Sequence, residues 1–213
     1  MYIMKIVTGS KTGDGWVSRY LNRPVSGYIT RFILWLRPSV SPNTISILVF
    51  LITAIGGLSF ALNLPLIAGI LIHASSVLDG CDGEIARVTS KQSKFGDFLD
   101  SVLDRYGDML ILTGAMIFIW YNNTNNYLIV ILLVFVLSLG GSFQISYTAA
   151  KFSLAGKSVS RTIEGRDSRM FILAISAILA EWFPIAVFGG LILIGIISNF
   201  FIIYRIYKAH NTF

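Results

Sequence analysis

Long apolar runs, several of them close to the length of a membrane-spanning helix, restrict this chain to few folds. An α-helix needs about 20 predominantly apolar residues to cross the hydrocarbon core of a bilayer. The composition agrees, because 54% of the 213 residues are hydrophobic and only 13% are charged, whereas about a quarter of the residues in a typical soluble domain are charged. The sequence therefore predicts an all-α, polytopic membrane protein.

Six segments of the sequence are predicted to cross the membrane as helices. Short polar turns separate several of them, such as the segment YNNTNN at 121–126. Together the six helices form one predicted membrane domain over residues 42–208, and residues 1–15 form a short N-terminal tail. The predicted spans are 42–62, 65–90, 94–121, 127–150, 167–183 and 184–208.

Residues 16–37 are predicted to form an interfacial amphipathic helix instead of a span. Helical spacing divides them into a polar and an apolar face, which suits a helix that lies along the membrane surface. Pro24 either begins the second half of this helix or kinks it. The polar face consists of Arg19, Asn22, Arg23, Ser26 and Thr30, and the apolar face consists of Val17, Leu21, Tyr28, Phe32 and Trp35.

The basic residues are distributed in a way that indicates membrane topology. The formal net charge is +6, with 17 Lys and Arg residues, but these residues flank the apolar segments and do not form one basic block. This distribution argues against nucleic acid as a partner. Because cytoplasmic loops are enriched in Lys and Arg, we expect a multi-pass protein of the cell membrane, with both termini and the loops near 92 and 160 in the cytoplasm.

Four aspartates lie within two of the predicted membrane helices, where a carboxylate is costly unless it faces a polar cavity. Asp79 and Asp82 are three residues apart, and Asp100 and Asp104 are four apart, so each pair lies on one helical face. A short turn joins the two helices, and we expect antiparallel neighbours whose carboxylates converge in an active site facing the cytoplasm. Oxygen ligands without His or Cys favour Mg²⁺ or Mn²⁺, and four carboxylates can hold two ions.

Small residues keep the helix faces beside these aspartates free of bulk. Gly83 and Ala86 lie beside the first pair, and Gly96 lies one turn before the second pair. They either allow close helix packing, which is common in membranes, or make room for a bound nucleotide. Arg87 also has two interpretations, which are an ion pair with Glu84 and a bidentate contact to phosphate.

The stretch from Asp79 to Asp104 resembles the signature of the CDP-alcohol phosphotransferase family, D-x-x-D-G-x-x-A-R-x(8)-G-x-x-x-D-x-x-x-D, at all eight fixed positions. The resemblance implies a homodimeric membrane enzyme that moves a phosphoryl-linked alcohol from a CDP-alcohol to an acceptor hydroxyl, releasing CMP and forming a phosphodiester. It also implies that Asp79, Asp82 and Asp100 bind metal, and that Asp104 binds metal and serves as the general base. The predicted nucleotide-binding residues are Asp79, Gly83, Ala86, Arg87 and Gly96.

Further polar residues have weaker assignments. Pro42-Asn43 resembles the Pro-Asn pair of the same family, and Asn43 either reaches a phosphate or belongs to the helix start. Basic residues near the cytoplasmic mouth follow mainly from topology, but an acceptor that carries phosphate, as inositol phosphate does, would need some of them as a clamp. The candidates are Lys151, Arg161, Arg166 and Arg205. Arg105 and Asp108 are predicted to form a network inside the bundle.

The segment DGWVSRYLNRPVS at 14–26 favours one pair of substrates. It resembles the linker and interfacial helix of archaeal enzymes that make di-inositol phosphate phosphate from CDP-inositol and inositol phosphate. Those enzymes often carry a fused cytidylyltransferase domain, and this sequence contains none. We therefore expect either a stand-alone relative or the membrane half of a longer protein, with a cytidylyltransferase as a fused domain or partner.

Other functions fit parts of the pattern. A phospholipid synthase that uses CDP-diacylglycerol, such as a phosphatidylinositol phosphate synthase, shares the same signature. An ion-coupled transporter is a more distant alternative, because transporters also contain intramembrane acids but usually reveal broken helices or internal repeats. A non-catalytic membrane scaffold would have no reason to keep four converging acids in the bilayer.

Overall fold

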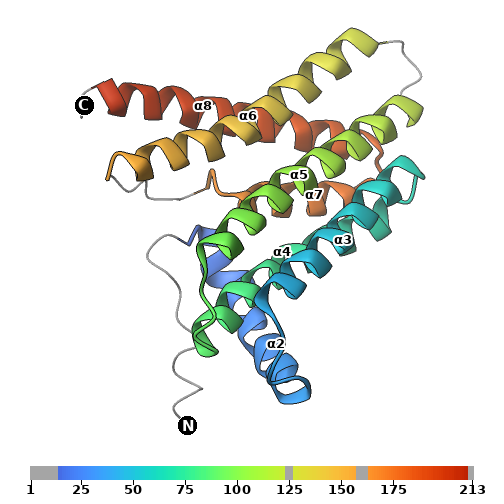
Figure 1. The fold of residues 1–213 in the computed structure, drawn as a ribbon. Helices are drawn as coiled ribbons and strands as arrows, with labels where there is room; N and C mark the ends of the chain where they lie inside the picture. The colour runs from blue at the N-terminus through green and yellow to red at the C-terminus, as the bar shows by residue number, and fades with distance from the viewer. Residues whose placement is uncertain (1–13, 123–126, 157–162, 211–213) are drawn as a thin grey trace.

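The computed structural model describes residues 14–122, 127–156 and 163–210. Within these ranges the chain forms seven α-helices, α2 to α8, and one π-helical turn, η1, and it contains no β-strand. The described part is thus all-α, as the sequence predicts. Figure 1 shows the long helices side by side, with α2 at the lower edge of the bundle in this view.

The N-terminal helix consists of η1, Ser18–Asn22, which runs directly into α2, Arg23–Leu36. Pro24 is the second residue of α2 and lies inside the continuous helical segment, where it has no N–H group to donate to the preceding turn, and the π-helical turn η1 comes directly before it. Thr30 is buried against α4, whereas Phe32 and Trp35 are exposed. The helix therefore turns its polar face towards the protein and its apolar face outwards.

Two residues near η1 depart from their predicted faces. Val17, assigned to the outer apolar face, is only 4% exposed, and Arg19, assigned to the polar face, is exposed. A π-helical turn closes i→i+5 hydrogen bonds and so contains more residues per turn than an α-helix. The faces predicted with 3.6 residues per turn are consequently correct for α2, but they are shifted for residues that come before or at the start of η1.

Six further helices follow, and their ends agree with the predicted spans to within four residues. Pro42 and Pro65 each occupy the first turn of a helix. Asn63 and Ser90, in the turns after the first two of these helices, adopt left-handed φ values of 61° and 53°. The helices are α3, Pro42–Ala61; α4, Pro65–Val88; α5, Lys94–Asn122; α6, Leu128–Leu154; α7, Arg166–Leu179; and α8, Ile185–His210.

Four of these helices, α3, α4, α6 and α8, are long and apolar enough to cross a membrane. Helix α5 has 29 residues, but charged residues interrupt the apolar character of its first half. Helix α7 has 14 residues, or about 21 Å at 1.5 Å per residue, which is shorter than the ~30 Å hydrocarbon core. The structure thus contains four candidate spans among its described helices, where the sequence predicts six.

Helix α3 lies between α4 and α5 and packs along both of them. Its contact with α5 is close because Gly57 and Gly114 face each other. A Cβ atom added to Gly57 would lie 2.7 Å from the carbonyl oxygen of Leu110, and one added to Gly114 would overlap with the Gly57 carbonyl group. The sequence predicts that α4 and α5 are packed neighbours, and this is wrong, because among the described elements those two helices do not pack along each other.

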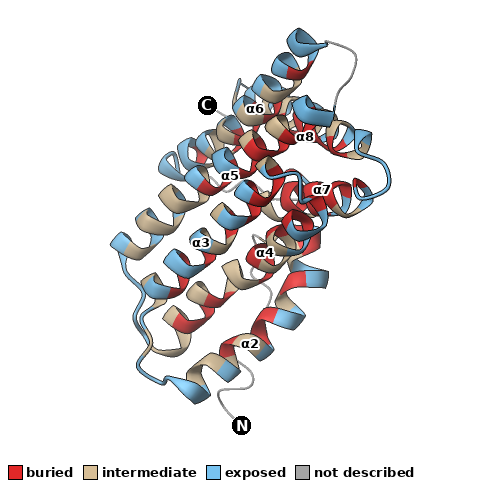
Figure 2. Cartoon of the chain, turned by 90° about the vertical axis from the view of Figure 1, so that its right-hand side faces the viewer, coloured by how far each residue is buried: buried red, intermediate tan, exposed pale blue. Residues whose placement is uncertain are grey.

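The apolar core occupies the half of the bundle nearer the α3–α4 turn. Phe60 near the end of α3 contacts Phe118 near the end of α5, with ring centroids 5.8 Å apart. Ile72 of α4, Leu173 of α7 and Leu191 of α8 extend this core. Figure 2 shows the buried residues on the helix faces that point towards one another. Polar groups gather in the opposite half, near the α4–α5 turn.

Candidate active site

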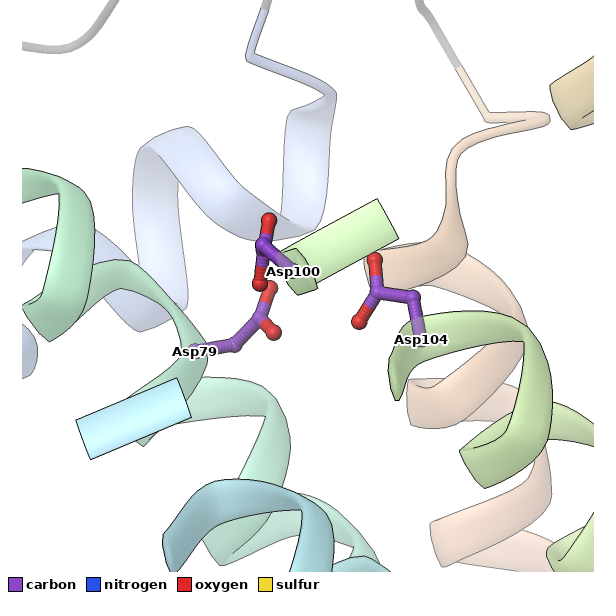
Figure 3. A group of neighbouring side chains, drawn as sticks. All are labelled: Asp79, Asp100 and Asp104. Atoms are coloured by element: carbon purple, nitrogen blue, oxygen red, sulfur yellow. The ribbon is translucent and has the colours of Figure 1, made fainter. Parts of the chain in front are cut away.

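Carboxylates from α4 and α5 meet in the polar half of the bundle. Asp79 lies on α4, and Asp100 and Asp104 lie one turn apart on α5. One oxygen of each of these three carboxylates lies within 4.8 Å of the others, and Figure 3 shows the three side chains pointing towards one another. The aspartates converge across the gap between α4 and α5, although the two helices are not packed together.

Asp82 lines the same cavity but is held by a different neighbour. Its carboxylate accepts a hydrogen bond of 2.6 Å from the hydroxyl of Ser46 on α3, and another from the backbone N–H of Gly83. Helix α3 therefore orients the fourth aspartate. The structure brings all four predicted aspartates to one cavity, three of them as a compact cluster.

Arg166 from α7 enters this cluster. Its Nη1 atom lies 3.0 Å from Oδ1 of Asp79 and 2.9 Å from Oδ1 of Asp104, and its Nε atom lies 2.9 Å from Oδ1 of Asp108. The fully buried Asp108 also pairs with Arg169 at 3.2 Å and, more loosely, with Arg105 at 3.9 Å. The predicted network of Arg105 and Asp108 inside the bundle is thus confirmed.

The charges of this network suit a divalent cation. Five carboxylates and three guanidinium groups take part, so their charged forms leave two formal negative charges uncompensated. The donors nearest one another are all carboxylate oxygens, which Mg²⁺ and Mn²⁺ prefer and which suit Zn²⁺ less well. The acidic cluster is therefore a candidate divalent-metal site. The participating residues are Asp79, Asp82, Asp100, Asp104, Asp108, Arg105, Arg166 and Arg169.

The larger of two cavities beside the acidic cluster is polar and has a volume of about 990 Å³. It opens beside the α4–α5 turn, and the four aspartates lie on its wall. The structure also brings together here the remaining residues predicted to contact a nucleotide or its phosphates, which are Asn43, Gly83, Ala86, Arg87 and Gly96. A site of this size and polarity can hold a nucleotide diphosphate close to the acidic cluster.

Arg87 does not form the ion pair with Glu84 that the sequence leaves open. Both oxygens of the buried Glu84 carboxylate are engaged elsewhere, by Arg23 at 3.1 Å, by the Ser26 hydroxyl at 2.8 Å and by the Thr30 hydroxyl at 2.7 Å. Glu84 thus anchors α2 to α4. Arg87 instead lines the larger cavity, where its guanidinium is available to a phosphate.

A second cavity of about 770 Å³ shares Asp100, Asp104 and Arg166 with the first. Its other basic lining residues are Arg105, Arg169 and Arg205. The guanidinium of Arg205 is 2% exposed, donates to the Thr148 hydroxyl at 2.9 Å and lies 3.3 Å from Oε1 of Glu164. The two cavities therefore meet at the acidic cluster, and the second one is rich in arginine.

One predicted acceptor residue, Lys151, is not part of this arrangement. Lys151 is exposed, with its Nζ atom 5.4 Å from the centroid of the Tyr147 ring, and it lines neither of the two cavities. Its side chain lies along the outer surface of α6. Arg161 falls outside the residues that the structure describes.

Sequence reasoning missed several residues of the site. Arg169 lies three residues after Arg166 on α7, and this spacing on one helical face was the available signal. Glu164 was also missed, and it forms a buried pair with the predicted Arg205 that joins distant parts of the chain. The contribution of Asn22 to the larger cavity depends on how α2 docks against α4, which no local pattern encodes.

A family model described as CDP-alcohol phosphatidyltransferase matches residues 39–203. The chain belongs to this family. It is a CDP-alcohol phosphatidyltransferase family enzyme, and the four aspartates on the cavity wall lie within the matched region.

The chain also matches curated proteins related to it within the family. The chain is 39% identical over 183 residues to the bifunctional IPC transferase and DIPP synthase of Archaeoglobus fulgidus, which covers 80% of this chain but only 35% of that protein. It is 35% identical over 173 residues to the archaetidylinositol phosphate synthase of Pyrococcus horikoshii, covering 80% of this chain and 84% of the relative. The chain therefore spans about a third of the bifunctional relative.

Crystal structures of Mycobacterium tuberculosis phosphatidylinositol phosphate synthase, PgsA1, share the fold. The one with CDP-DAG bound superposes with a TM-score of 0.72 at 22% identity, covering 86% of this chain and 92% of that chain. The complex with manganese and citrate gives a TM-score of 0.73 at 22% identity, covering 85% and 87%. The CDP-alcohol phosphatidyltransferase described here is thus a multi-pass membrane protein with the fold of PgsA1.

Proposed function

We propose that the enzyme uses CDP-inositol as donor and inositol phosphate as acceptor. The observation that carries this proposal is the meeting of two cavities at Asp100, Asp104 and Arg166. One cavity contains the predicted nucleotide-binding residues, and the other is lined by arginines. Such an arrangement suits a nucleotide-linked donor on one side and an anionic acceptor on the other.

In the larger cavity, the donor diphosphate lies against the acidic cluster. Asp79, Asp82, Asp100 and Asp104 hold Mg²⁺ or Mn²⁺, and two ions fit the number of carboxylates. Bound metal supplies attraction for the diphosphate and stabilises the charge that develops on departing CMP. The nucleotide lies along Gly83, Ala86 and Gly96, where small side chains leave room, and Arg87 contacts a phosphate. Asn43 lines the same cavity.

Asp104 is the proposed general base of the reaction. It lines both cavities, so an acceptor hydroxyl from the second cavity can approach it beside the donor phosphate. The hydroxyl oxygen attacks the β-phosphorus, the bond from that phosphorus to the oxygen of CMP breaks, and CMP leaves with the bonding electrons. Asp104 accepts the hydroxyl proton, and the product is a phosphodiester.

In the second cavity, Arg166 and Arg205 are the proposed contacts to the acceptor phosphate. Both are held by carboxylates and polar groups that orient their guanidinium groups, and an arginine can bind phosphate through two hydrogen bonds. Lys151 and Arg161 are kept as sequence-based candidates for the same role, because basic side chains in cytoplasmic segments attract an anionic acceptor.

A phospholipid synthase is the alternative function. Pyrococcus horikoshii archaetidylinositol phosphate synthase is 35% identical and is covered over 84% of its length, and PgsA1 with CDP-DAG bound shares the fold. In that case the donor is a CDP-linked lipid, whereas the acceptor and the roles of the four aspartates are unchanged. The bifunctional relatives favour CDP-inositol, because the Archaeoglobus protein has the higher identity over a similar share of this chain.

The membrane arrangement follows from the same proposal. Helices α5 and α7 join the four apolar spans as the third and fifth of six crossings within residues 42–208, with their charged ends at the cavities. The helix at 16–37 lies in the interface with its aromatic side chains towards lipid, after a tail at 1–15. Both termini and the active site face the cytoplasm. The enzyme is a homodimer. A cytidylyltransferase, either as a fused domain or as a separate partner, supplies its donor.

The proposal is tested by incubating purified protein and Mg²⁺ with pairs of donors and acceptors and measuring CMP release. The donors are CDP-inositol and CDP-diacylglycerol, and the acceptors are inositol and inositol phosphate. We expect CMP from CDP-inositol only when inositol phosphate is present, with the phosphodiester identified by mass spectrometry. CMP release from CDP-diacylglycerol alone among the donors would assign the phospholipid synthase instead.

A further inference from the structure

One wall of the larger cavity comes from a segment that precedes the family match. Ser18, Asn22 and Arg23, from η1 and the start of α2, line the cavity next to Asp79, whereas the family model begins at residue 39. The four aspartates lie within the matched region, whereas Ser18 and Asn22 precede it. We call Ser18, Asn22 and Ser76 of α4 the polar wall.

Asn22 in this wall has an unused hydrogen-bond acceptor. The side chain is buried, with 4% exposed, and its Nδ2 atom donates to the carbonyl oxygen and the hydroxyl of Ser76 at 3.2 Å and 3.0 Å. Its Oδ1 atom is buried and receives no hydrogen bond from the described residues. Buried acceptors are normally satisfied, and because Asn22 lines the cavity, a hydroxyl of a bound ligand can donate to it.

The position of the polar wall along α4 indicates which part of the donor it contacts. Arg87 lies eight residues after Asp79, towards the α4–α5 turn, whereas Ser76 lies three residues before Asp79, one turn deeper in the bundle. The donor diphosphate lies at the aspartates, and its nucleoside extends towards Arg87. Its alcohol then extends in the other direction along α4, towards Ser76 and Asn22.

We infer that Asn22 recognises the alcohol of the donor and selects a polyhydroxylated alcohol over an acylated glycerol. The inference rests on the proposed function and adds a specificity-determining residue to it. A polyol offers hydroxyl groups to Ser18, Ser76 and the unused acceptor of Asn22. A diacylglycerol would bury apolar chains against these groups and leave them without partners, which is unfavourable.

Arg23 positions the polar wall. It pairs with Asp14 through two contacts of 3.0 Å and with the buried Glu84 at 3.1 Å. Burial disfavours the charge on Arg23, but the carboxylates of Asp14 and Glu84 outweigh this and raise the pKa of Arg23 above its ordinary value. The charged guanidinium thus ties the start of α2 to Glu84 of α4, eight residues along that helix from Ser76.

The test measures donor KM and product inhibition for Asn22→Ala. We expect the KM for CDP-inositol to rise about 2- to 12-fold, the range for losing one neutral hydrogen bond, while the inhibition constant of CMP stays at the wild-type value. CMP carries the nucleotide but not the alcohol, so its binding separates a lost alcohol contact from a distorted site. Ser76→Ala, which removes one of the two acceptors of the Asn22 amide, should shift the same KM in the same direction, and it serves as the test should Asn22→Ala fail to fold.

Arg19→Gln is the matched control, because Arg19 is exposed on the same turn and lies outside the cavity lining. It should leave both constants unchanged. An unchanged KM in both the Asn22 and Ser76 variants, or a CMP inhibition constant that rises in parallel with KM, would overturn the inference while the proposed function stands. A wild-type enzyme that accepts CDP-diacylglycerol and rejects CDP-inositol would instead overturn the proposed donor and this inference with it.

Discussion

The Nη1 atom of Arg166 lies 3.0 Å from Oδ1 of Asp79, although the two residues are 87 positions apart in the sequence. The same nitrogen lies 2.9 Å from Oδ1 of Asp104. One guanidinium from α7 therefore holds carboxylates of α4 and α5 together across the gap between those helices. It supplies the counter-charge that acidic side chains inside a membrane protein need.

Replacing Arg166 should make the fold more dependent on metal. In Arg166→Gln the carboxylates face one another without this charge, and removing one partner of a buried ion pair typically costs about 3–5 kcal/mol. We expect a lower thermal midpoint than wild type in EDTA, and a larger rise in that midpoint on adding Mg²⁺, because the ion replaces the lost charge. Thermal unfolding in detergent measures both. The exposed Arg37, changed to Gln, is the control, and an equal Mg²⁺ effect in the two variants would contradict the prediction.

Arg205 should act on the acceptor and not on the donor. A charged hydrogen bond contributes about 1.5–3 kcal/mol, so Arg205→Gln should raise the KM for inositol phosphate roughly 10- to 150-fold with a much smaller change in the KM for CDP-inositol. Arg205→Lys keeps the charge beside Glu164, so its KM for inositol phosphate should lie between the values for the wild type and for Arg205→Gln. Arg37→Gln provides the comparison, since Arg37 is exposed and lies outside both cavities. Equal shifts of both KM values would remove Arg205 from the acceptor site.

The crossing of α3 and α5 should tolerate no side chain at Gly114. A Cβ atom there overlaps with the Gly57 carbonyl group, and overpacking of this kind costs about 1–3 kcal/mol or more. Gly114→Ala should therefore lower the thermal midpoint and the yield of folded protein. Gly140→Ala is matched to it, because nothing lies within 4 Å of its added Cβ, and alanine favours a helix by about 0.5–1 kcal/mol. A Gly114→Ala protein as stable as Gly140→Ala would contradict the described crossing.

The orientation of the protein can be read from cysteine labelling in sealed vesicles. A cysteine replacing Gln92, in the α4–α5 turn, should react with an impermeant reagent only from the cytoplasmic side. One replacing the exposed Tyr121, at the other end of α5, should react only from the opposite side. Buried Cys81 is expected to stay unmodified. Labelling of both positions from the same side would rule out α5 as a crossing helix.

The helices could be predicted well because their limits are local properties. Runs of apolar residues set their lengths, and Pro42, Pro65 and Asn63 mark starts and turns that any neighbourhood would respect. Their packing order could not be predicted in the same way. The expectation that α4 and α5 pack together followed from their short connection, whereas the close approach of Gly57 and Gly114 places α3 between them.

The same distinction between local sequence signals and tertiary packing applies to the candidate site. The aspartates and the small residues beside them recur at helical spacings, so their shared faces follow from sequence, and the structure places them around one cavity. Partners drawn from other helices do not follow from sequence spacing. Arg166 reaches the cluster because α7 docks on α4, and Asn22 reaches the cavity because α2 turns its polar face inwards. Both contacts depend on tertiary packing.

The most direct test of the account is Mn²⁺ binding to purified wild-type protein and to Asp79→Asn, Asp100→Asn and Asp104→Asn, followed by isothermal titration calorimetry and by electron paramagnetic resonance of the bound ion. Each substitution removes a charged oxygen ligand from the three-carboxylate cluster, so we predict at least a tenfold weaker Mn²⁺ affinity in every variant together with loss of CMP release. Glu181→Gln, at an exposed carboxylate outside both cavities, should bind Mn²⁺ as wild type does. Wild-type Mn²⁺ affinity in all three aspartate variants would show that the cluster is not the metal centre.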